Sequence, residues 1–420
     1  MQSNYSQWRA AHPLVFIATL LLIGVLLSKQ YIHCATEQTS TIAISILLFS
    51  TGFIWLLSIL KIQNSIVGAS LYFTLISWGI AIQIASQKHA LLFIPYPTEM
   101  ILDCRNWVIT KLNTTITNKE ANGFAQAIVL GVKMDMDPQL MNAYTQLGIV
   151  HIIAISGMHL EILFKNLKRL TILLPRKSFF LLCELILLLT CVWIYTLMAF
   201  ASPSIVRASL FFSIHAIGKF LGANSFMLNT IAGGVLVILL FDIQHLNHIG
   251  LQLSYSAVIG IHLFYNLLFK SIELKNPIIQ FLWSNCCMSL SAQLTTFPIL
   301  TLHFHQIAGW VLVSNFIMVP LSNYILYGLG ILIILPIQIP FTFILGRMVE
   351  KYIVFFNHFV NSWFLQTKAS SIQITMSGIQ ILMYYLILLF LYLWLYLKQP
   401  KWLLAIMGLF SIYFLQKLFS

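Results

Sequence analysis

Long apolar segments recur along the whole chain, separated by short polar connections. Each is close to the roughly 20 residues that an α-helix needs to cross the hydrocarbon core of a bilayer. Inside a bilayer every backbone polar group has to be bonded within the protein, so segments of this kind form helices. Only 8% of the 420 residues are charged, which leaves too little polar surface to cover a soluble globule. The sequence therefore predicts an all-α, polytopic transmembrane protein.

The apolar pattern predicts roughly ten to thirteen crossings, because short or re-entrant segments blur the number. Pro320 interrupts one long span, and the helix is predicted to break there. Broken or re-entrant helices are therefore part of the expected fold. The predicted spans are residues 13–29, 41–61, 65–86, 146–166, 178–200, 203–221, 225–241, 246–269, 277–301, 307–337, 376–397 and 401–417.

These spans divide the chain into four regions. Residues 1–92 are predicted to hold N-terminal transmembrane helices, and residues 93–145 an amphipathic region outside the membrane. Residues 146–337 form the predicted transmembrane core. In residues 338–420, charged side chains between apolar positions predict an interfacial helix over 338–362, and C-terminal spans follow it.

Lysine and arginine residues are concentrated in alternate connections between the spans. Because cytoplasmic loops are enriched in these residues, the pattern places the N-terminus inside and residues 30–40 and 87–145 outside. The net charge of +12 has the same explanation and does not by itself indicate a nucleic-acid partner. Cys34 and Cys104 fall in the external segments, where a disulfide between them would persist. Two free thiols fit the sequence equally well.

The segment 148–160 places His151, Ser156 and His159 inside an apolar run that Gly157 interrupts. Polar groups at membrane depth are costly unless they face protein or water, so they often mark a pathway or a site. A glycine weakens the helix and lets the backbone open, as in the broken helices of transporters. The alternative is a helix whose histidine and serine side chains bond to neighbouring helices.

A second polar group follows in the next helix. Pro203 suits the first helical position after a serine cap. Arg207 lies nearly one turn further on, so it has to be paired, contact water or extend to the membrane surface. One helical face is predicted for Ser204, Arg207, Phe211 and His215.

Two further groups lie in later spans. Gln252, Ser254 and Tyr255 begin an otherwise apolar helix, where a direct role and hydrogen bonding between helices are both open. A polar stripe follows in the next span, and Asn315 interrupts the one after it. A stripe of this length is what the wall of an aqueous passage would require. Its members are Asn285, Ser289, Gln293 and Thr296.

Taken together, these blocks resemble the ComEC competence protein family. The hallmark likeness lies in residues 151–160, and residues 127–131 resemble the short segment that precedes it. Later blocks at 201–208 and 252–258, and the run from Gln293 through Pro298 to Asn315, follow in the family's order. The likeness covers roughly residues 120–335 and implies a channel in the bacterial cytoplasmic membrane for DNA uptake in transformation.

The resemblance implies single-stranded DNA and the lipid membrane as partners. A nuclease, a DNA receptor and a translocation ATPase would be separate polypeptides, since the chain has neither a P-loop nor a His-x-His-x-Asp-His pattern. We expect no enzymatic activity, cofactor or metal site. The expected substrate path comprises His151, Ser156, Gly157, His159, Arg207, Gln252, Ser254, Tyr255, Gln293 and Asn315.

The chain also departs from the family pattern. Val132 stands where an acidic residue is usual, and Ile243 stands where proline is frequent. No OB-like or β-lactamase-like domain is expected, so the chain is predicted to be the membrane core alone. Two alternatives remain open: an exporter of small solutes, and an intramembrane hydrolase with Ser156 as nucleophile and His151 or His159 as base.

Overall fold

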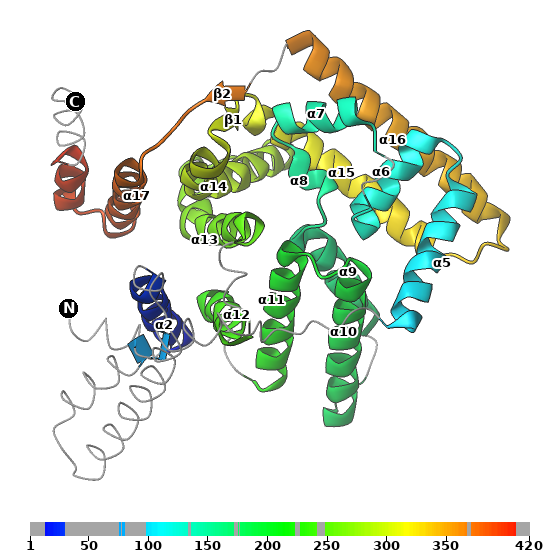
Figure 1. Ribbon diagram of the computed structural model, residues 1–420, viewed down its shortest axis with the longest axis horizontal. Helices are drawn as coiled ribbons and strands as arrows, with labels where there is room; N and C mark the ends of the chain where they lie inside the picture. Colours follow the sequence, from blue (N-terminus) through cyan, green and yellow to red (C-terminus); the bar gives the residue numbers. More distant parts are fainter. Residues whose placement is uncertain are drawn as a thin grey trace, which may run out of the picture. The chain divides into compact units, whose positions relative to one another are not determined.

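The computed structural model describes residues 13–29, 98–132, 136–171, 177–222, 227–241, 248–367 and 371–408, with a few more residues near 75–79 and at 175. Within these ranges the regular structure is helical apart from two short strands, so the predicted all-α class is confirmed (Figure 1). The helices are α2 (Pro13–Lys29), α5 (Glu99–Thr115), α6 (Lys119–Leu130), α7 (Pro138–Gln146), α8 (Val150–Ile153), α9 (Gly157–Thr171), α10 (Ser178–Met198), α11 (Pro203–Phe220), α12 (Met227–Phe241), α13 (Ile249–Phe269), α14 (Pro277–Phe304), α15 (Val311–Ile334), α16 (Pro340–Thr367) and α17 (Gly378–Leu397). The strands are β1 (Gln306–Ala308) and β2 (Ser371–Gln373), which pair antiparallel.

Four of the described helices, α10, α13, α15 and α17, are long and apolar enough to cross a membrane. Shorter apolar helices occupy Pro13–Ile23 and Met227–Leu239. The predicted spans 41–61 and 65–86 lie outside the described residues, and the last predicted span is helical over the described residues 400–408. The remaining predicted crossings stay predictions.

Two predicted spans differ from the structure. The predicted span 146–166 is two helices, α8 and α9, so the expected interruption is confirmed, although it precedes Gly157. The predicted break at Pro320 is wrong, because α15 continues through this residue. Proline removes one backbone donor, and the buried side chains of Met318 and Ser322 hold the flanking turns against the rest of the protein.

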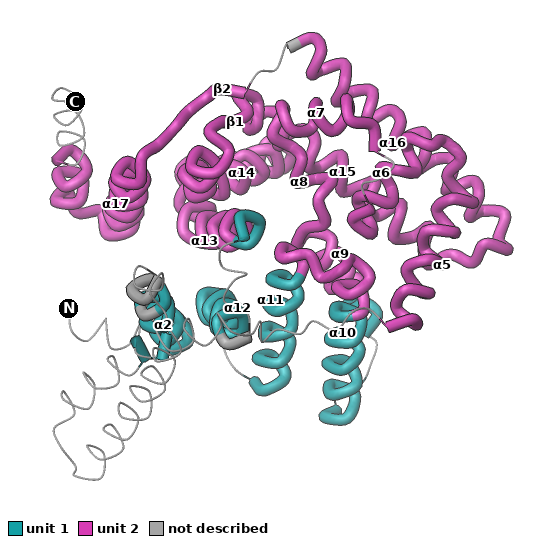
Figure 2. The backbone as a smooth tube through the Cα atoms, viewed as in Figure 1, with its two compact units in different colours: residues 1–96, 167–193, 206–251 teal, residues 97–166, 194–205, 252–420 magenta. Residues whose placement is uncertain are grey.

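The chain divides into two compact units, coloured separately in Figure 2. The first contains residues 1–96, 167–193 and 206–251, and the second contains the rest. In the first unit α2 packs against α12 through Leu21, Val25 and Leu239. Trp193 also donates from Nε1 to Ser213 Oγ across 3.1 Å, which links α10 to α11.

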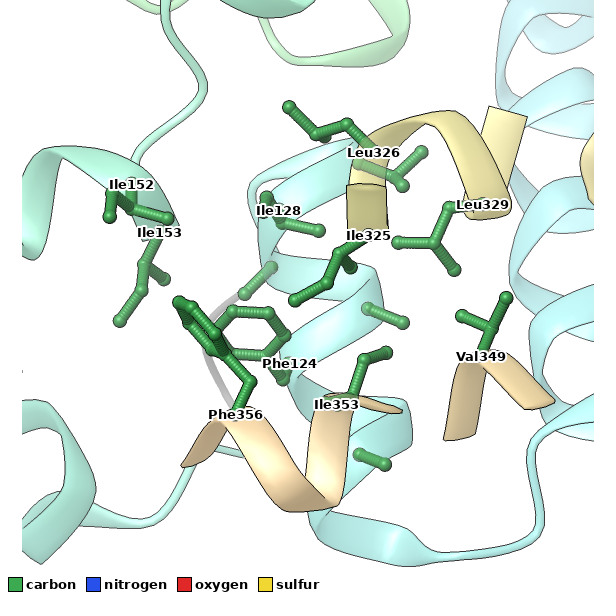
Figure 3. Packing of buried hydrophobic residues seen from close by; sticks show 14 of the residues in the cluster. Phe124, Ile128, Ile152, Ile153, Ile325, Leu326, Leu329, Val349, Ile353 and Phe356 are labelled. Atoms are coloured by element: carbon green, nitrogen blue, oxygen red, sulfur yellow. The ribbon is translucent and has the colours of Figure 1, made fainter. Parts of the chain in front are cut away.

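The core of the second unit lies among α6, α7, α8, α15 and α16, which come from distant parts of the sequence. Figure 3 shows Phe124 of α6 and Ile325 of α15 converging with Ile353 and Phe356 of α16. The rings of Phe124, Tyr144 and Phe356 are 5.9 to 6.3 Å apart. The predicted amphipathic region is thus helical and packs on α15 and α16, which burial of apolar surface stabilises.

Polar contacts fix this packing. Tyr144 donates from its hydroxyl to Asn357 Oδ1 across 3.0 Å, and Asn357 Nδ2 lies 3.3 Å from Glu120 Oε1. The backbone N–H groups of Thr117 and Asn118 donate to Glu350 Oε2 at 2.5 and 3.2 Å. The helix predicted over 338–362 is therefore α16, and one of its faces is tied to α6 and α7; its place at the membrane surface stays a prediction.

Two cations of α5 are buried at helix ends. Arg105 donates to the carbonyls of Leu130 and Met198, which end α6 and α10. Lys111 is 1% exposed and donates from Nζ to the Ile333 carbonyl across 2.6 Å and to the Leu335 carbonyl, at the end of α15. The last carbonyls of a helix lack partners within the helix and carry partial negative charge, so both cations stabilise these ends.

We expect Lys111→Met to lower the free energy of unfolding by about 2 kcal/mol, because two carbonyls of α15 lose their donor in a buried setting. Lys119→Met is the matched control, since Lys119 is exposed at the start of α6. Thermal unfolding of the purified protein in detergent measures the difference. Equal melting temperatures for the two variants would contradict the assigned role of Lys111.

Candidate functional site

The interruption between α8 and α9 is closed by a helix cap. Ser156 precedes α9, and its Oγ accepts the Met158 backbone N–H across 3.3 Å. In return, the Ser156 backbone N–H donates to His159 Nδ1 across 3.1 Å. This reciprocal pattern is a variant of the capping box: histidine takes the place of glutamate or glutamine, and the serine accepts from the second instead of the third backbone N–H of the helix. We call it the Ser156–His159 cap.

The cap determines the state of the imidazole. Because Nδ1 accepts a backbone N–H, the neutral ring carries its proton on Nε2. His159 is 6% exposed, and Nε2 has no hydrogen-bond partner in the described part of the protein. The Nε2–H group of His159 is therefore a buried donor without an acceptor among the described residues.

Two other sequence blocks meet the same interruption. Ser204, at the start of α11, donates from Oγ to the Ile155 carbonyl across 2.9 Å. Gly131 ends α6 with a positive φ of 73°, and a Cβ there would lie 3.1 Å from Ile155 Cδ1. The blocks at 127–131, 151–160 and 201–208 are thus joined at Ile155. His151, on the short helix α8, is exposed.

A second polar group lies between α14 and α15. Gln293 Nε2 donates to Ser289 Oγ across 3.3 Å, and Asn315 Nδ2 donates to the same oxygen across 3.1 Å. We call Ser289, Gln293 and Asn315 the amide cluster. Asn315 Oδ1 and Asn285 Nδ2 are buried and have no partner among the described residues. Thr296 instead bonds to the Ala292 carbonyl of its own helix, across 3.0 Å.

The predicted group on α13 is divided between two sets of contacts. Gln252 Oε1 lies 3.3 Å from His303 Nε2 of α14. Ser254 and Tyr255 are half-buried on the same helix. The next residue of α13, Ser256, pairs with Thr295 of α14: each donates from its hydroxyl to the other's backbone carbonyl, across 2.7 Å in both directions. This second pair joins α13 to α14 and is structural.

Arg207 belongs to the first unit, on α11, where it is 8% exposed. Phe211 and His215 stack on the same helix, with ring centroids 6.4 Å apart. The predicted shared face is thus seen for these two residues. Cys104 is exposed on α5, but Cys34 lies outside the described residues, so the disulfide between them stays a prediction.

The structure therefore brings together Ser156 with His159, and Gln293 with Asn315 through Ser289.

Sequence reasoning missed Asn323, whose buried Oδ1 also has no partner in the described part of the chain. Its signal was present: Asn323 follows Asn315 by eight residues within one apolar helix. It also missed Arg105 and Lys111, whose partners are far away in the sequence.

Comparisons with known proteins support the resemblance. A family model described as "Competence protein" matches residues 128–399. "ComE operon protein 3" of Bacillus subtilis (strain 168) is 30% identical over 228 residues, which are 53% of this chain. The chain thus spans only 27% of that relative's length. No solved structure matches.

The family match includes both the Ser156–His159 cap and the amide cluster, as well as the four candidate membrane spans. It also covers well over half of the sequence. The protein is accordingly a membrane protein that belongs to the ComEC competence protein family.

Proposed function

We propose that the protein passes single-stranded DNA across the bacterial cytoplasmic membrane during natural transformation. Membership of the competence family supports a role in DNA uptake. The observation that carries the proposal is the amide cluster: Asn315 Oδ1 within it and Asn285 Nδ2, one turn before Ser289, are buried without a partner among the described residues. Such atoms are costly between apolar helices unless water or a passing polar molecule satisfies them.

The chemistry of the cargo fits this arrangement. A strand carries one negative charge per nucleotide, and moving a bare ion into hydrocarbon costs on the order of 20 kcal/mol. Passage therefore requires a hydrated, polar route. Neutral amides offer many weak contacts, which lets the strand move on. Tyr255 would supply a ring on which bases stack.

Other polypeptides complete the proposal. The sequence has no P-loop, so we expect a separate ATPase to drive translocation. A DNA receptor and a nuclease for the second strand are expected to be separate as well.

The test is DNA uptake in the native host with a labelled duplex. We expect Gln293→Leu and Asn315→Leu each to lower internalised DNA at least about tenfold, since each removes a part-buried polar contact from the cluster. Surface-bound DNA should not change. Gln280→Leu makes the same change at an exposed position of α14 and serves as control. Normal internalisation in both cluster variants would reject the proposal.

The same assay addresses the exporter alternative, because an exporter of small solutes would leave DNA uptake intact in a strain that lacks the protein. The hydrolase alternative has one observation in its favour. Ser156 Oγ lies 3.2 Å from His159 Nδ1, within reach of a catalytic base. The Ser156–His159 cap accounts for this contact without a nucleophile.

A further inference from the structure

Pro298 lies inside α14 and has no backbone N–H. In a helix this N–H would bond to the carbonyl four residues earlier, which belongs to Leu294. Membrane helices tolerate a proline because neighbouring helices satisfy the freed group. The question is which side chain does so here.

The donor comes from α17. Tyr384 donates from its hydroxyl to the Leu294 carbonyl across 3.0 Å, and its ring stacks on Phe297 with centroids 5.5 Å apart. The next residue, Tyr385, donates to the Thr295 carbonyl across 3.0 Å. Two adjacent tyrosines thus bind the turn of α14 that precedes the proline.

The two hydroxyls are not equivalent. The Thr295 carbonyl also accepts from Ser256 Oγ, across 2.7 Å, so it keeps a side-chain donor if Tyr385 is lost. The Leu294 carbonyl, by contrast, accepts from one side chain among the described residues, that of Tyr384. Its loss would leave a part-buried carbonyl without a side-chain donor, which is costly.

Leu294 follows Gln293 directly, and Ser289 lies one turn earlier. The position of the amide cluster on α14 therefore depends on how this turn is held. We propose that Tyr384 is a positioning residue: its hydroxyl replaces the backbone donor removed by Pro298 and holds Gln293 against Ser289. The hydrogen bond and its effect on stability do not depend on what the protein does, whereas the importance of Tyr384 for DNA uptake rests on the proposed function.

A double-substitution experiment tests this directly. Tyr384→Phe removes the hydroxyl and keeps the ring, and Pro298→Ala restores an N–H that can bond to the Leu294 carbonyl. In the native background we expect Tyr384→Phe to lower the melting temperature of the purified full-length protein by about 3 °C. In the Pro298→Ala background the same change should cost less than about 1 °C, because the carbonyl is already satisfied.

Two controls remove the same atom elsewhere. Tyr385→Phe should have a smaller effect than Tyr384→Phe, because Ser256 still serves its acceptor. Tyr392 lies on the same helix, and its ring packs edge-on against Phe264, with ring centroids 6.1 Å apart. Tyr392→Phe should therefore have little effect on the melting temperature. Transformation frequency is measured for every variant, and Tyr384→Phe is expected to lower it roughly tenfold in the native background only.

Equal losses in the two backgrounds would overturn the proposal, since the Tyr384 hydroxyl would then act independently of Pro298. Tyr384→Phe alone could prevent the protein from accumulating in the membrane. In that case, normal accumulation of the Pro298→Ala, Tyr384→Phe double variant supports the proposal, and failure of the double variant to accumulate overturns it. A third outcome is that the loss in melting temperature depends on Pro298 as expected, but Tyr384→Phe takes up DNA normally while Gln293→Leu does not. This outcome would overturn the positioning role of Tyr384. If the loss in melting temperature depends on Pro298 but Tyr384→Phe and Gln293→Leu both take up DNA normally, DNA passage through the cluster is rejected. The hydrogen bond from Tyr384 to the Leu294 carbonyl is then still supported.

Discussion

Gly260→Ala is expected to lower the free energy of unfolding by about 3 kcal/mol, the largest effect that we predict for a single methyl group. A Cβ at this position of α13 would lie 2.2 Å from Thr295 Oγ1 and 2.4 Å from the Ser291 carbonyl oxygen of α14. The second atom is backbone, so rotating a side chain cannot relieve the clash. The two helices would have to move apart.

Separation of α13 and α14 would also break the reciprocal Ser256–Thr295 hydrogen bonds, each 2.7 Å long. The Ser256 hydroxyl would then lose its acceptor, which adds to the steric cost, whereas the Thr295 carbonyl keeps Tyr385 and the Thr295 hydroxyl keeps the Ala292 carbonyl. Small residues at helix contacts in membranes allow this close approach, and Gly260 is the residue that allows it here.

Thermal unfolding of the purified protein measures the change, and Gly330→Ala is the matched control. Gly330 lies within α15, and no heavy atom stands within 4 Å of a Cβ built there. This control should be neutral or slightly stabilising, by up to about 1 kcal/mol, because alanine favours the helix. If Gly260→Ala melts with the control, the close contact between α13 and α14 is incorrect.

His159→Leu is expected to have an effect of similar size, a loss of about 3 kcal/mol in the free energy of unfolding. It removes the acceptor of the Ser156 backbone N–H and so opens the cap at the start of α9. His159→Gln should recover most of this loss, because glutamine is an ordinary capping-box residue at this position. Thermal unfolding of the two variants measures the difference, and equal losses would contradict the cap.

Variants at Ser156 separate the cap from catalysis. Ser156→Asn keeps a capping oxygen and has no hydroxyl nucleophile, whereas Ser156→Ala loses both. A cap predicts that the asparagine variant retains DNA uptake and that the alanine variant is impaired. A hydrolase predicts that both are inactive. Uptake of labelled DNA, measured beside protein levels in the membrane, distinguishes these results.

Several elements could be predicted closely from local patterns. The span predicted over 203–221 is α11, which begins at Pro203 as expected. The stripe on α14 follows from helical spacing, and Gln293 indeed contacts Ser289 one turn away. Such features depend on residues within a few turns of each other, which periodicity and capping rules describe well.

Other features could not be predicted from local rules. Pro320 was expected to break its helix, but proline costs only a few kcal/mol, and packing of the neighbouring turns outweighs it. The same rules identify Pro298 but not the tyrosine that satisfies the freed carbonyl, 90 residues away. His159 was expected to act from within a helix, whereas it closes the helix start.

By itself, the sequence determined the helical class and the positions of the polar blocks along the described helices, because apolar periodicity and helix signals are local. Only the tertiary structure decided which distant groups meet. Lys111 reaches the Ile333 carbonyl, Ser204 reaches the Ile155 carbonyl and Asn315 reaches Ser289. These contacts depend on how helices pack, and packing is decided by the summed burial and hydrogen bonding of many residues that are remote in the sequence.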